Sequence, residues 1–335
     1  MDTLYFDLRR EEERQAGINA AAAALKRGDV IAFPTETVYG LGGLAKDAQA
    51  VKRIFAVKGR PLNNPVLVHV SNMDMAKETG HFTPLALELS KLWPAPLSLV
   101  VPAAPWVPKE VTAGLSTVGI RMPRHEGALG LIEAAGPIAA PSANLSGRPS
   151  PTELGHVKED LDGKIPVILD GGPCELGLES TVIDATGDVP VILRPGAITC
   201  EMVAALVGDC RIAKGVLEQV TADSAMSPGM LHKHYAPRGQ AVLVVGEHAA
   251  QRGEELLMKA LREGKRALMV GPGLTAKDHV IPCDVMGEHG LFYALREADE
   301  RKAEFIVILG TDTRGENLAY MNRAIRAAGY RVDKE

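Results

Sequence analysis

Short apolar runs ended by proline or glycine fill the first two thirds of this chain. The strand candidates cover residues 30–33, 66–70, 97–101, 118–122, 138–140, 167–170, 181–184 and 191–194. Most are rich in Val and Ile, which predicts buried β-strands. Helical patterns occur between only some of them, at 11–27, 47–57, 84–92 and 129–135. Because parallel strands need a long crossover and antiparallel strands do not, this incomplete alternation predicts an α/β domain with a twisted sheet of mixed strand direction.

The C-terminal third alternates more regularly. Strands are predicted at 241–245, 267–270 and 305–308, and helices at 249–263, 289–302 and 315–328. This order predicts a smaller Rossmann-like α/β domain. It lacks the Gly-x-Gly-x-x-Gly fingerprint, so no dinucleotide is assigned to it. Residues 211–238 lose periodicity. We therefore expect one domain at 1–210, a linker at 211–238 and a C-terminal domain at 239–335.

Composition excludes several classes of protein. At 335 residues, two domains are expected, and the net charge of −5 argues against a nonspecific nucleic-acid binder. The four cysteines are scattered and form no Cys-x-x-Cys pair, which fits a reducing cytosol better than a zinc site or a disulfide framework. The acidic N-terminus is unlike a signal peptide, and no apolar run approaches the roughly 20 residues of a membrane span. We expect a cytoplasmic protein without membrane contact.

Four cations fall at or just past the ends of apolar runs. Lys58 and Arg60 follow the helix predicted at 47–57, Arg121 interrupts one strand, and Arg194 closes another. A cation at a strand edge is costly to bury unless an anion meets it. If these edges point into one crevice, they would hold a polyanion such as a nucleoside triphosphate.

Each polar position also has a plainer interpretation. His69 alternates with apolar residues, as a hydrogen-bonded core histidine would. Arg121 fits either a structural ion pair or the bidentate capture of a carboxylate. Ser142 and Asn144 follow a strand, where turns and ligand sites both occur, and Ser180 invites the same two interpretations. Lys58 and Arg60 could simply be a solvated helix terminus.

Standard nucleotide and hydrolase signatures are missing. The sequence has no Gly-x-x-x-x-Gly-Lys-Ser/Thr loop, no kinase-type Asp-Phe-Gly string and no Gly-x-Ser-x-Gly elbow. His232 and His234 lie close in sequence without a complete zinc signature around them. The residues by themselves thus predict an α/β protein that binds an anionic small molecule.

Five motifs together resemble the YrdC family. They are Phe-Pro-Thr-Glu-Thr-Val-Tyr-Gly-Leu-Gly at 33–42, Lys-Gly-Arg-Pro at 58–61, Pro-Ser-Ala-Asn-Leu-Ser-Gly at 141–147, Ser-Thr-Val at 180–182 and Leu-Arg-Pro-Gly at 193–196. The resemblance covers roughly residues 13–205. The segment 227–237 and the α/β tail resemble the long form of this family, which carries an extra C-terminal domain.

The resemblance implies a threonylcarbamoyl-adenylate synthase, a nucleotidyltransferase that combines L-threonine, bicarbonate and ATP. Its products would be L-threonylcarbamoyl-adenylate and pyrophosphate, and the adenylate would feed the N6-threonylcarbamoyladenosine modification of tRNA at position 37. A downstream threonylcarbamoyl transferase complex acting on tRNA would be the partner. Mg²⁺ would arrive with ATP, with no organic prosthetic group and no protein-bound metal. The resemblance also implies that residues 1–210 are a YrdC-like catalytic domain with a large open cavity, and that the linker at 211–238 covers this active site.

The family pattern also implies roles for single residues. The catalytic cations would be Lys58 and Arg60. The L-threonine site would comprise Thr35, His69, Arg121, Ser142 and Ser180. The ATP contacts would be Lys58, Arg60, Asn64, Thr117, Asn144, Ser150, Arg194 and the linker residue Tyr235.

Two other functions remain open on the sequence. A noncatalytic RNA-binding module could use the same cations, although aromatic residues make up only 4% of the chain. A carbamoyl-adenylate-handling enzyme with another acceptor is the second alternative. Such proteins usually carry extra zinc-finger or acylphosphatase-like regions, and this sequence shows none.

Overall fold

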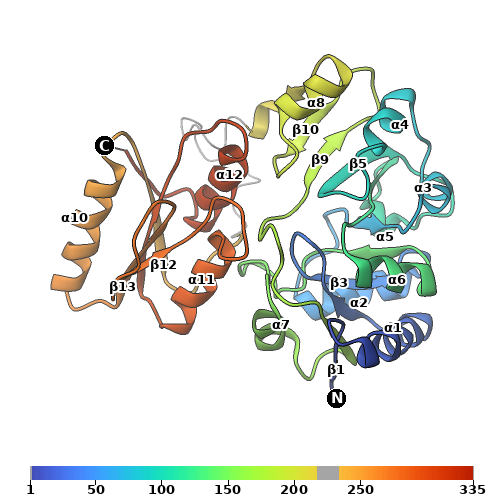
Figure 1. The fold of residues 1–335 in the computed structure, drawn as a ribbon, viewed down its shortest axis with the longest axis horizontal. Helices are drawn as coiled ribbons and strands as arrows, with labels where there is room; N and C mark the ends of the chain where they lie inside the picture. Colours follow the sequence, from blue (N-terminus) through green and yellow to red (C-terminus); the bar gives the residue numbers. More distant parts are fainter. Residues whose placement is uncertain (1, 217–233, 335) are drawn as a thin grey trace. The chain divides into compact units, whose positions relative to one another are not determined.

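The structure is a computed structural model that describes residues 2–216 and 234–334 (Figure 1). It contains two compact units. The first takes residues up to Ser146, then Pro151–Glu175 and Glu179–Ile212. The second takes the C-terminal part from Ala213 onward, together with two short pieces of the earlier chain, Gly147–Ser150 and Leu176–Leu178. Each unit is described by itself below.

The first unit is built on one large sheet, which has 11 strands in the described part of the chain. In spatial order these are β1 (Leu4–Asp7), β8 (Val167–Asp170), β2 (Ile31–Phe33), β3 (Gly40–Leu44), β7 (Ile138–Ala140), β4 (Leu67–His69), β6 (Thr117–Arg121), β5 (Leu97–Pro102), β9 (Thr181–Asp184), β10 (Val191–Arg194) and β11 (Arg211–Ile212). The sheet contains both parallel pairs, such as β4–β6, and antiparallel pairs, such as β5–β6. The predicted mixed sheet is confirmed.

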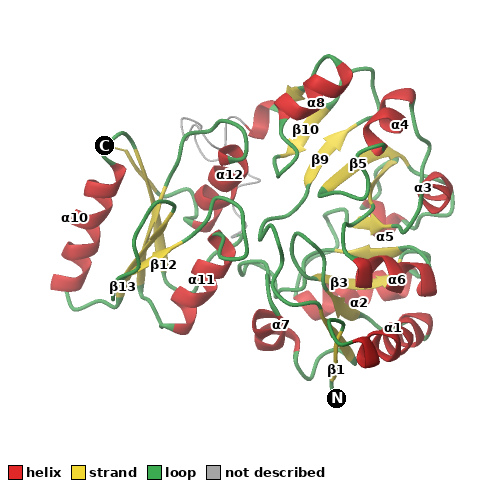
Figure 2. Ribbon diagram, in the orientation of Figure 1, coloured by secondary structure: helices red, strands yellow, loops and turns green. Residues whose placement is uncertain are grey.

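Helices cover parts of both faces of this sheet, as Figure 2 shows. They are α1 (Glu11–Lys26), α2 (Ala48–Lys58), α3 (Met73–Thr79), α4 (Pro84–Ser90), α5 (Lys109–Thr112), α6 (Glu126–Ala135), α7 (Leu154–Leu161) and α8 (Cys200–Val207). The Asp47 side chain caps the start of α2 by accepting from the backbone N–H of Gln49, and Gly59 ends it at φ 62°. This left-handed glycine cap leaves Lys58 as the last helical residue.

Among the described residues, three apolar clusters lie against the sheet, and two of them flank the strands discussed below. Helices α1 and α6 pack together over the β2–β3–β7 region, where Leu25 and Leu131 meet Phe33 and Ile138. A second core gathers Val68 and Ile120 from the central strands with residues of α3 and α4. Strands β4, β6 and β5 therefore bury one face in this second core, and their opposite face lies outside it.

Strand β3 is not among the strands that the sequence predicts. Residues 40–44 pair with β2 and β7. A Cβ at Gly42 would lie 2.6 Å from Ile138 Cγ2 and 2.9 Å from the Phe33 ring, and a Cβ at Gly40 would meet the same ring at 2.9 Å. The glycines are thus needed because the Phe33 ring lies across this strand.

The second unit has a five-stranded sheet that is parallel throughout, with order β14 (Val280–Pro282), β13 (Ala267–Gly271), β15 (Phe305–Leu309), β12 (Gln240–Val245) and β16 (Val332–Lys334). Its helices are α10 (Ala249–Arg262), α11 (Leu291–Glu300) and α12 (Asn317–Ala327). Figure 1 shows α10 on one face of the sheet and α11 and α12 on the other. The predicted parallel α/β domain is confirmed, with β15 inserted between β12 and β13.

No helix in residues 2–216 or 234–334 is long and apolar enough to cross a membrane.

Candidate active site

Three buried polar residues lie side by side on neighbouring central strands. His69 of β4 is in register with Arg121 of β6, and Arg121 is in register with Ser98 of β5. Residues paired in this way point to the same face of a sheet. The three residues are almost fully buried, with exposed fractions of 4% for His69, 3% for Arg121 and 0% for Ser98. They form a polar row on the face opposite the apolar core of the central strands.

The same face is half-open further along β6. Gly119 and Thr117 alternate with the buried Val118 and Ile120, so they share the face of Arg121, and both are partly exposed. Leu67 of β4, whose side chain lies over Gly119, is also partly exposed. Thr117 stands roughly 13 Å from Arg121 along the strand. This face therefore offers an elongated surface with a buried polar end.

The loop between β2 and β3 folds onto that polar end. The Arg121 Nη1 donates to Thr37 Oγ1 at 2.9 Å. Thr37 Oγ1 lies 2.8 Å from Thr35 Oγ1, which donates in turn to the Val38 carbonyl at 2.7 Å. Thr35 Oγ1 also accepts from the Thr37 and Val38 backbone N–H groups. The predicted threonine ligand Thr35 therefore fixes the shape of this loop.

Arg121 also forms a buried ion pair. Its Nη2 lies 2.6 Å from Glu36 Oε2, and the two side chains are 4% and 1% exposed. The geometry is poor for hydrogen bonding, since neither Glu36 oxygen and neither Nε nor Nη2 of Arg121 has a hydrogen-bond partner in the described part of the chain. His69 Nδ1 is a further buried atom without such a partner there. Buried charges are normally hydrogen-bonded, so this cluster has capacity for a polar ligand.

His69 is held neutral. Burial, followed by the nearby charge of Arg121, lowers its pKa to about 3. Its ring meets the Phe33 ring edge-on, with centroids 5.7 Å apart. A neutral imidazole keeps one nitrogen as an acceptor, so His69 can accept a hydrogen bond without adding charge beside Arg121.

Lys58, Ser142 and Asn144 are brought together. Lys58 Nζ donates to the carbonyls of Ser142 and Asn144 at 2.5 and 2.6 Å. Ser142 Oγ donates to Asn144 Oδ1 at 2.5 Å, and the Ser146 N–H donates to the Lys58 carbonyl. The buried ammonium of Lys58 thus organises the loop after β7, and positive charge lies beside the two predicted ligands.

A second group joins the other end of the polar row. Ser98 Oγ and Ser180 Oγ are 2.8 Å apart. Arg194 donates to Ser180 twice, from Nε to its carbonyl and from Nη2 to its hydroxyl, both at 3.0 Å. The predicted residues Ser180 and Arg194 are therefore linked through Ser98 to the strand beside Arg121.

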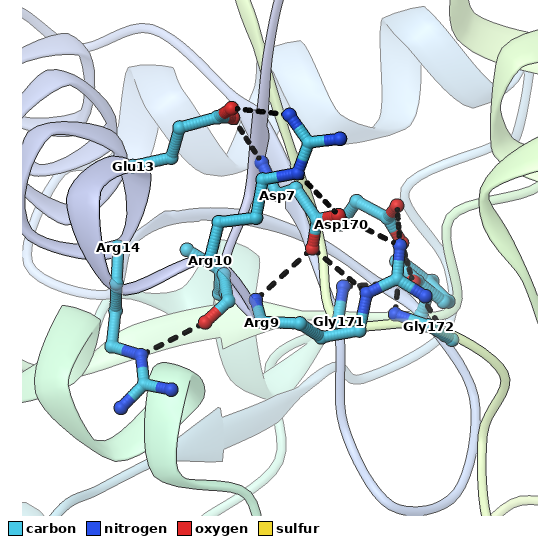
Figure 3. A network of polar contacts seen from close by, with 10 residues as sticks. Asp7, Arg9, Arg10, Glu13, Arg14, Asp170, Gly171 and Gly172 are labelled. Carbon is cyan, nitrogen blue, oxygen red and sulfur yellow. Dashed lines mark hydrogen bonds and ion pairs between the residues drawn. The ribbon is translucent and has the colours of Figure 1, made fainter.

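A carboxylate network fixes the outer end of the β2–β3 loop. Figure 3 shows the Arg9 guanidinium between the carboxylates of Asp7 and Asp170, which it contacts at 2.8 and 2.9 Å. The Tyr39 hydroxyl lies 3.0 Å from Asp170 Oδ1 and 2.7 Å from the Gly172 carbonyl. Tyr39 is fully buried. Its hydroxyl ties the loop that carries Glu36 and Thr37 to the end of β8.

The remaining predicted residues are Arg60, Asn64, Ser150 and Tyr235. Arg60 is half-buried beside the Phe55 ring, and Asn64 lies in an exposed loop. Ser150 is fully buried and belongs to the second unit. So does Tyr235, whose ring packs on that of Phe292 with centroids 4.9 Å apart. Residues 217–233 of the predicted linker lie outside the described residues.

Sequence reasoning missed Glu36, Thr37 and Ser98 as members of this cluster. Glu36 and Thr37 follow Thr35 in the quoted motif, but a carboxylate three residues past a strand is typical of an ordinary turn. Ser98 alternates with Leu97 and Leu99, and that placement on the face of Arg121 was the available signal.

Comparison with known proteins gives a consistent result over the whole chain. Residues 23–196 match the family model for Sua5, YciO and YrdC proteins, described as "Telomere recombination". Residues 198–329 match the model "Threonylcarbamoyl-AMP synthase, C-terminal domain". The resemblance found in the sequence is thereby confirmed.

Individual relatives agree with the family models. The chain is 44% identical to the threonylcarbamoyl-AMP synthase of Pyrococcus abyssi, over 97% of this chain and 98% of the relative. It is 44% identical to that of Bacillus subtilis, over 94% of each. A crystal structure of P. abyssi Sua5 complexed with L-threonine superposes with a TM-score of 0.89 at 43% identity, covering 99% of this chain and 100% of the other.

Proposed function

This chain belongs to the Sua5–YciO–YrdC family, and from that membership we propose that it is a threonylcarbamoyl-AMP synthase. It converts L-threonine, bicarbonate and ATP into L-threonylcarbamoyl-adenylate and pyrophosphate. The product is a reactive mixed anhydride, which a downstream transferase complex uses to modify tRNA in the cytoplasm.

One observation carries the proposal. The row of His69, Arg121 and Ser98 is buried, yet Arg121 Nε and Nη2 and His69 Nδ1 have no hydrogen-bond partner among the described residues. A small polar substrate carrying a carboxylate would satisfy these atoms. The L-threonine bound to the P. abyssi relative is a substrate of this kind.

Threonine binds, in this proposal, with its carboxylate on Arg121. The neutral ring of His69 and the hydroxyls of Ser142 and Ser180 orient its other polar groups. Thr35 acts through the loop, because its hydroxyl is engaged in shaping residues 35–38. This assigns direct charge recognition to Arg121 and shape recognition to its neighbours.

ATP meets the cations that surround this site. Lys58, Arg60 and Arg194 offset the charge that develops on pyrophosphate as it leaves, and Mg²⁺ arrives as part of the nucleotide substrate. Asn64, Thr117, Asn144, Ser150 and Tyr235 supply the remaining nucleotide contacts. The half-open face from Arg121 to Thr117 is long enough for an extended nucleotide beside an amino acid.

The chemistry needs positioning more than a covalent nucleophile. The threonine amine attacks the carbon of CO2 and loses a proton, or attacks the carbon of bicarbonate with loss of water, and either route gives a carbamate. A carbamate oxygen then attacks the α-phosphorus of ATP, and the bond to pyrophosphate breaks. Fixed cations and a buried substrate pocket lower the barrier by electrostatic stabilisation and by limiting water access.

The test is direct. The protein is incubated with L-threonine, bicarbonate, Mg²⁺ and ATP, and the products are followed by rapid mass spectrometry and by pyrophosphate release. We expect the mixed anhydride to appear only when both threonine and bicarbonate are present. Pyrophosphate release that ignores threonine would refute the proposed function.

A further inference from the structure

We propose that Glu36 reads the ammonium group of the amino-acid substrate, so that Glu36 and Arg121 together select a zwitterion over a plain carboxylate. This inference rests on the proposed function, because it concerns the threonine site. It makes Glu36 a specificity-determining residue in addition to those that the sequence predicts.

The geometry of the pair matches an α-amino acid. The nitrogen and carboxyl carbon of such a molecule share one Cα and stand about 2.5 Å apart. The opposite charges of the protein are similarly close, since Arg121 Nη2 lies 2.6 Å from Glu36 Oε2. A zwitterion lying alongside the pair can place its carboxylate toward Arg121 and its ammonium toward Glu36 in one orientation.

The atoms of the pair that lack hydrogen-bond partners among the described residues point to a ligand. A purely structural pair at 1% and 4% exposure would be expected to have its remaining atoms hydrogen-bonded. Both oxygens of Glu36 and two nitrogens of Arg121 instead have no such bond among the described residues. An ammonium group supplies the donors that the Glu36 oxygens lack, and a carboxylate supplies the acceptors that Arg121 lacks.

The surroundings leave Glu36 as the source of negative charge here. Burial lowers the pKa of His69 to about 3 and also lowers the pKa of His125, so both rings are neutral. Burial, followed by the nearby charge of Glu36, raises the pKa of the Cys174 thiol well above its usual range, so it stays protonated. Within the pair itself the charge is then one positive and one negative group, while the further cations Lys58 and Arg194 lie at Ser142 and Ser180.

Charge balance decides which ligand this pocket accepts. Beside this pair, a bound carboxylate without an ammonium group would bring a second negative charge close to Glu36, whereas a zwitterion brings a positive group to Glu36 as well. Because uncompensated charge is costly at low dielectric, the pocket should reject the simple anion. Replacing Glu36 by a neutral residue of the same shape should reverse this preference.

The experiment compares two ligands on the full-length protein by calorimetry, without ATP. The first is L-threonine, and the second is 2,3-dihydroxybutyrate, in which a hydroxyl replaces the amine. We expect Glu36→Gln to weaken L-threonine binding by about 10- to 100-fold while binding of the hydroxy acid is unchanged or tighter. A residue that only held Arg121 in place would weaken both ligands together, so the ratio of the two affinities is the readout.

Controls separate this role from loss of fold. Glu110→Gln removes a carboxylate that pairs with Lys52 at 3.3 Å elsewhere in the same unit, and it should leave both affinities unchanged. Circular dichroism checks folding of each variant. If Glu36→Gln does not fold, Glu36→Asp keeps the charge but withdraws it by one methylene group, and it should weaken L-threonine selectively.

The outcomes also separate this inference from the proposed function. Wild-type protein that binds no L-threonine would overturn the proposed function. Wild-type protein that binds and turns over L-threonine, beside a Glu36→Gln variant with an unchanged affinity ratio, would overturn the role of Glu36 alone.

Discussion

At the residue level, Arg121 combines two interpretations that the sequence left as alternatives. It forms an ion pair with Glu36 and a hydrogen bond with Thr37. It nevertheless keeps nitrogen atoms without hydrogen-bond partners in the described residues. A guanidinium group can do both because its five N–H groups form a planar fork, of which only part faces the loop.

Because Arg121 both pairs with Glu36 and has capacity for a ligand, the variant Arg121→Lys is more informative than Arg121→Ala. Removing the charge would leave Glu36 buried without its cation, which costs about 3–5 kcal/mol and risks unfolding. Lysine can still pair with Glu36, but it lacks the additional planar N–H groups with which arginine can bind a ligand carboxylate. We expect the KM for L-threonine to rise about tenfold or more, with the KM for ATP nearly unchanged.

Pyrophosphate release over a series of threonine concentrations measures this effect. The control is Arg124→Lys, because Arg124 is exposed and pairs with Glu175 at the surface. A threonine KM equal to that of the wild type would show that Arg121 only maintains the fold.

His69 gives a prediction about pH and stability. Its folded-state pKa is lowered to about 3, mainly by burial, whereas an exposed histidine titrates near 6.5. Between these values the unfolded chain binds a proton that the folded chain excludes, so stability falls as the pH drops from about 6.5 toward 3. His69→Gln should remove this dependence, which amounts to at most about 1.4 kcal/mol per pH unit.

Urea unfolding at several pH values from 4.5 to 7.5 tests this point. His279→Gln serves as the control, because His279 is exposed in the second unit. Parallel pH profiles for the wild type and His69→Gln would mean that His69 is protonated freely in the folded protein.

At the level of elements, apolar patterning predicts strands better than it predicts what lies between them. The Val- and Ile-rich runs form strands β2 and β4 to β10, with small differences in length from the predicted ranges. Burial of one or both faces of a strand produces this sequence pattern. Helices α3, α5, α7 and α8 were missed because each spans only two turns or fewer beyond its cap. Their short apolar faces give too few repeats to recognise.

The sequence pattern also points to part of the candidate site, but not to all of it. Strand ends and their motifs point to Arg121, Ser142, Ser180 and Arg194, since a cation or hydroxyl within or next to an apolar run is conspicuous. The partner of Arg121 does not stand out, because the contact between Glu36 and β6 joins residues 85 positions apart in sequence. Only the fold of the β2–β3 loop reveals it.

Strand β3 provides a test of this packing. Gly42→Ala would place a methyl group within 2.6 Å of Ile138 Cγ2 and 2.9 Å of the Phe33 ring, both in a fully buried region. We expect a loss of about 1–3 kcal/mol in the free energy of unfolding. Because Phe33 also touches His69, a weaker affinity for L-threonine should accompany the loss.

Chemical denaturation and threonine titration measure the two effects. Gly187→Ala is the matched control, since a Cβ at Gly187 would meet nothing within 4 Å. Wild-type stability in Gly42→Ala would mean that Phe33 moves freely and does not require a glycine beneath it.

At the level of the whole molecule, the second unit includes two pieces of the earlier chain. Residues Gly147–Ser150 follow directly on the loop that Lys58 organises, yet they cluster with the C-terminal part. Periodicity along a sequence cannot reveal such an arrangement, because it registers repeats within an element and not contacts between distant segments. The structure supplies the reason in the side chain of Arg296.

Arg296 holds this short segment inside the second unit. The residue is 1% exposed on α11, and its Nε and Nη2 donate to the Pro149 carbonyl at 3.1 and 2.7 Å. The Ala236 N–H donates to the Gly147 carbonyl at 2.8 Å. The segment thus depends on the C-terminal part for its conformation, and it ends at Ser150, for which we propose a nucleotide contact.

We therefore expect Arg296→Lys to raise the KM for ATP about five- to tenfold while changing the KM for L-threonine much less. Lysine keeps the charge but cannot donate twice to one carbonyl from a planar fork, and a hydrogen bond from a charged group contributes about 1.5–3 kcal/mol. Arg301→Lys is the control on the same part of the chain, because Arg301 is exposed and pairs with Glu297. Pyrophosphate release as a function of each substrate distinguishes the two constants. Equal increases in both would indicate a general loss of fold, and no increase in either would show that the 147–150 segment keeps its conformation without Arg296.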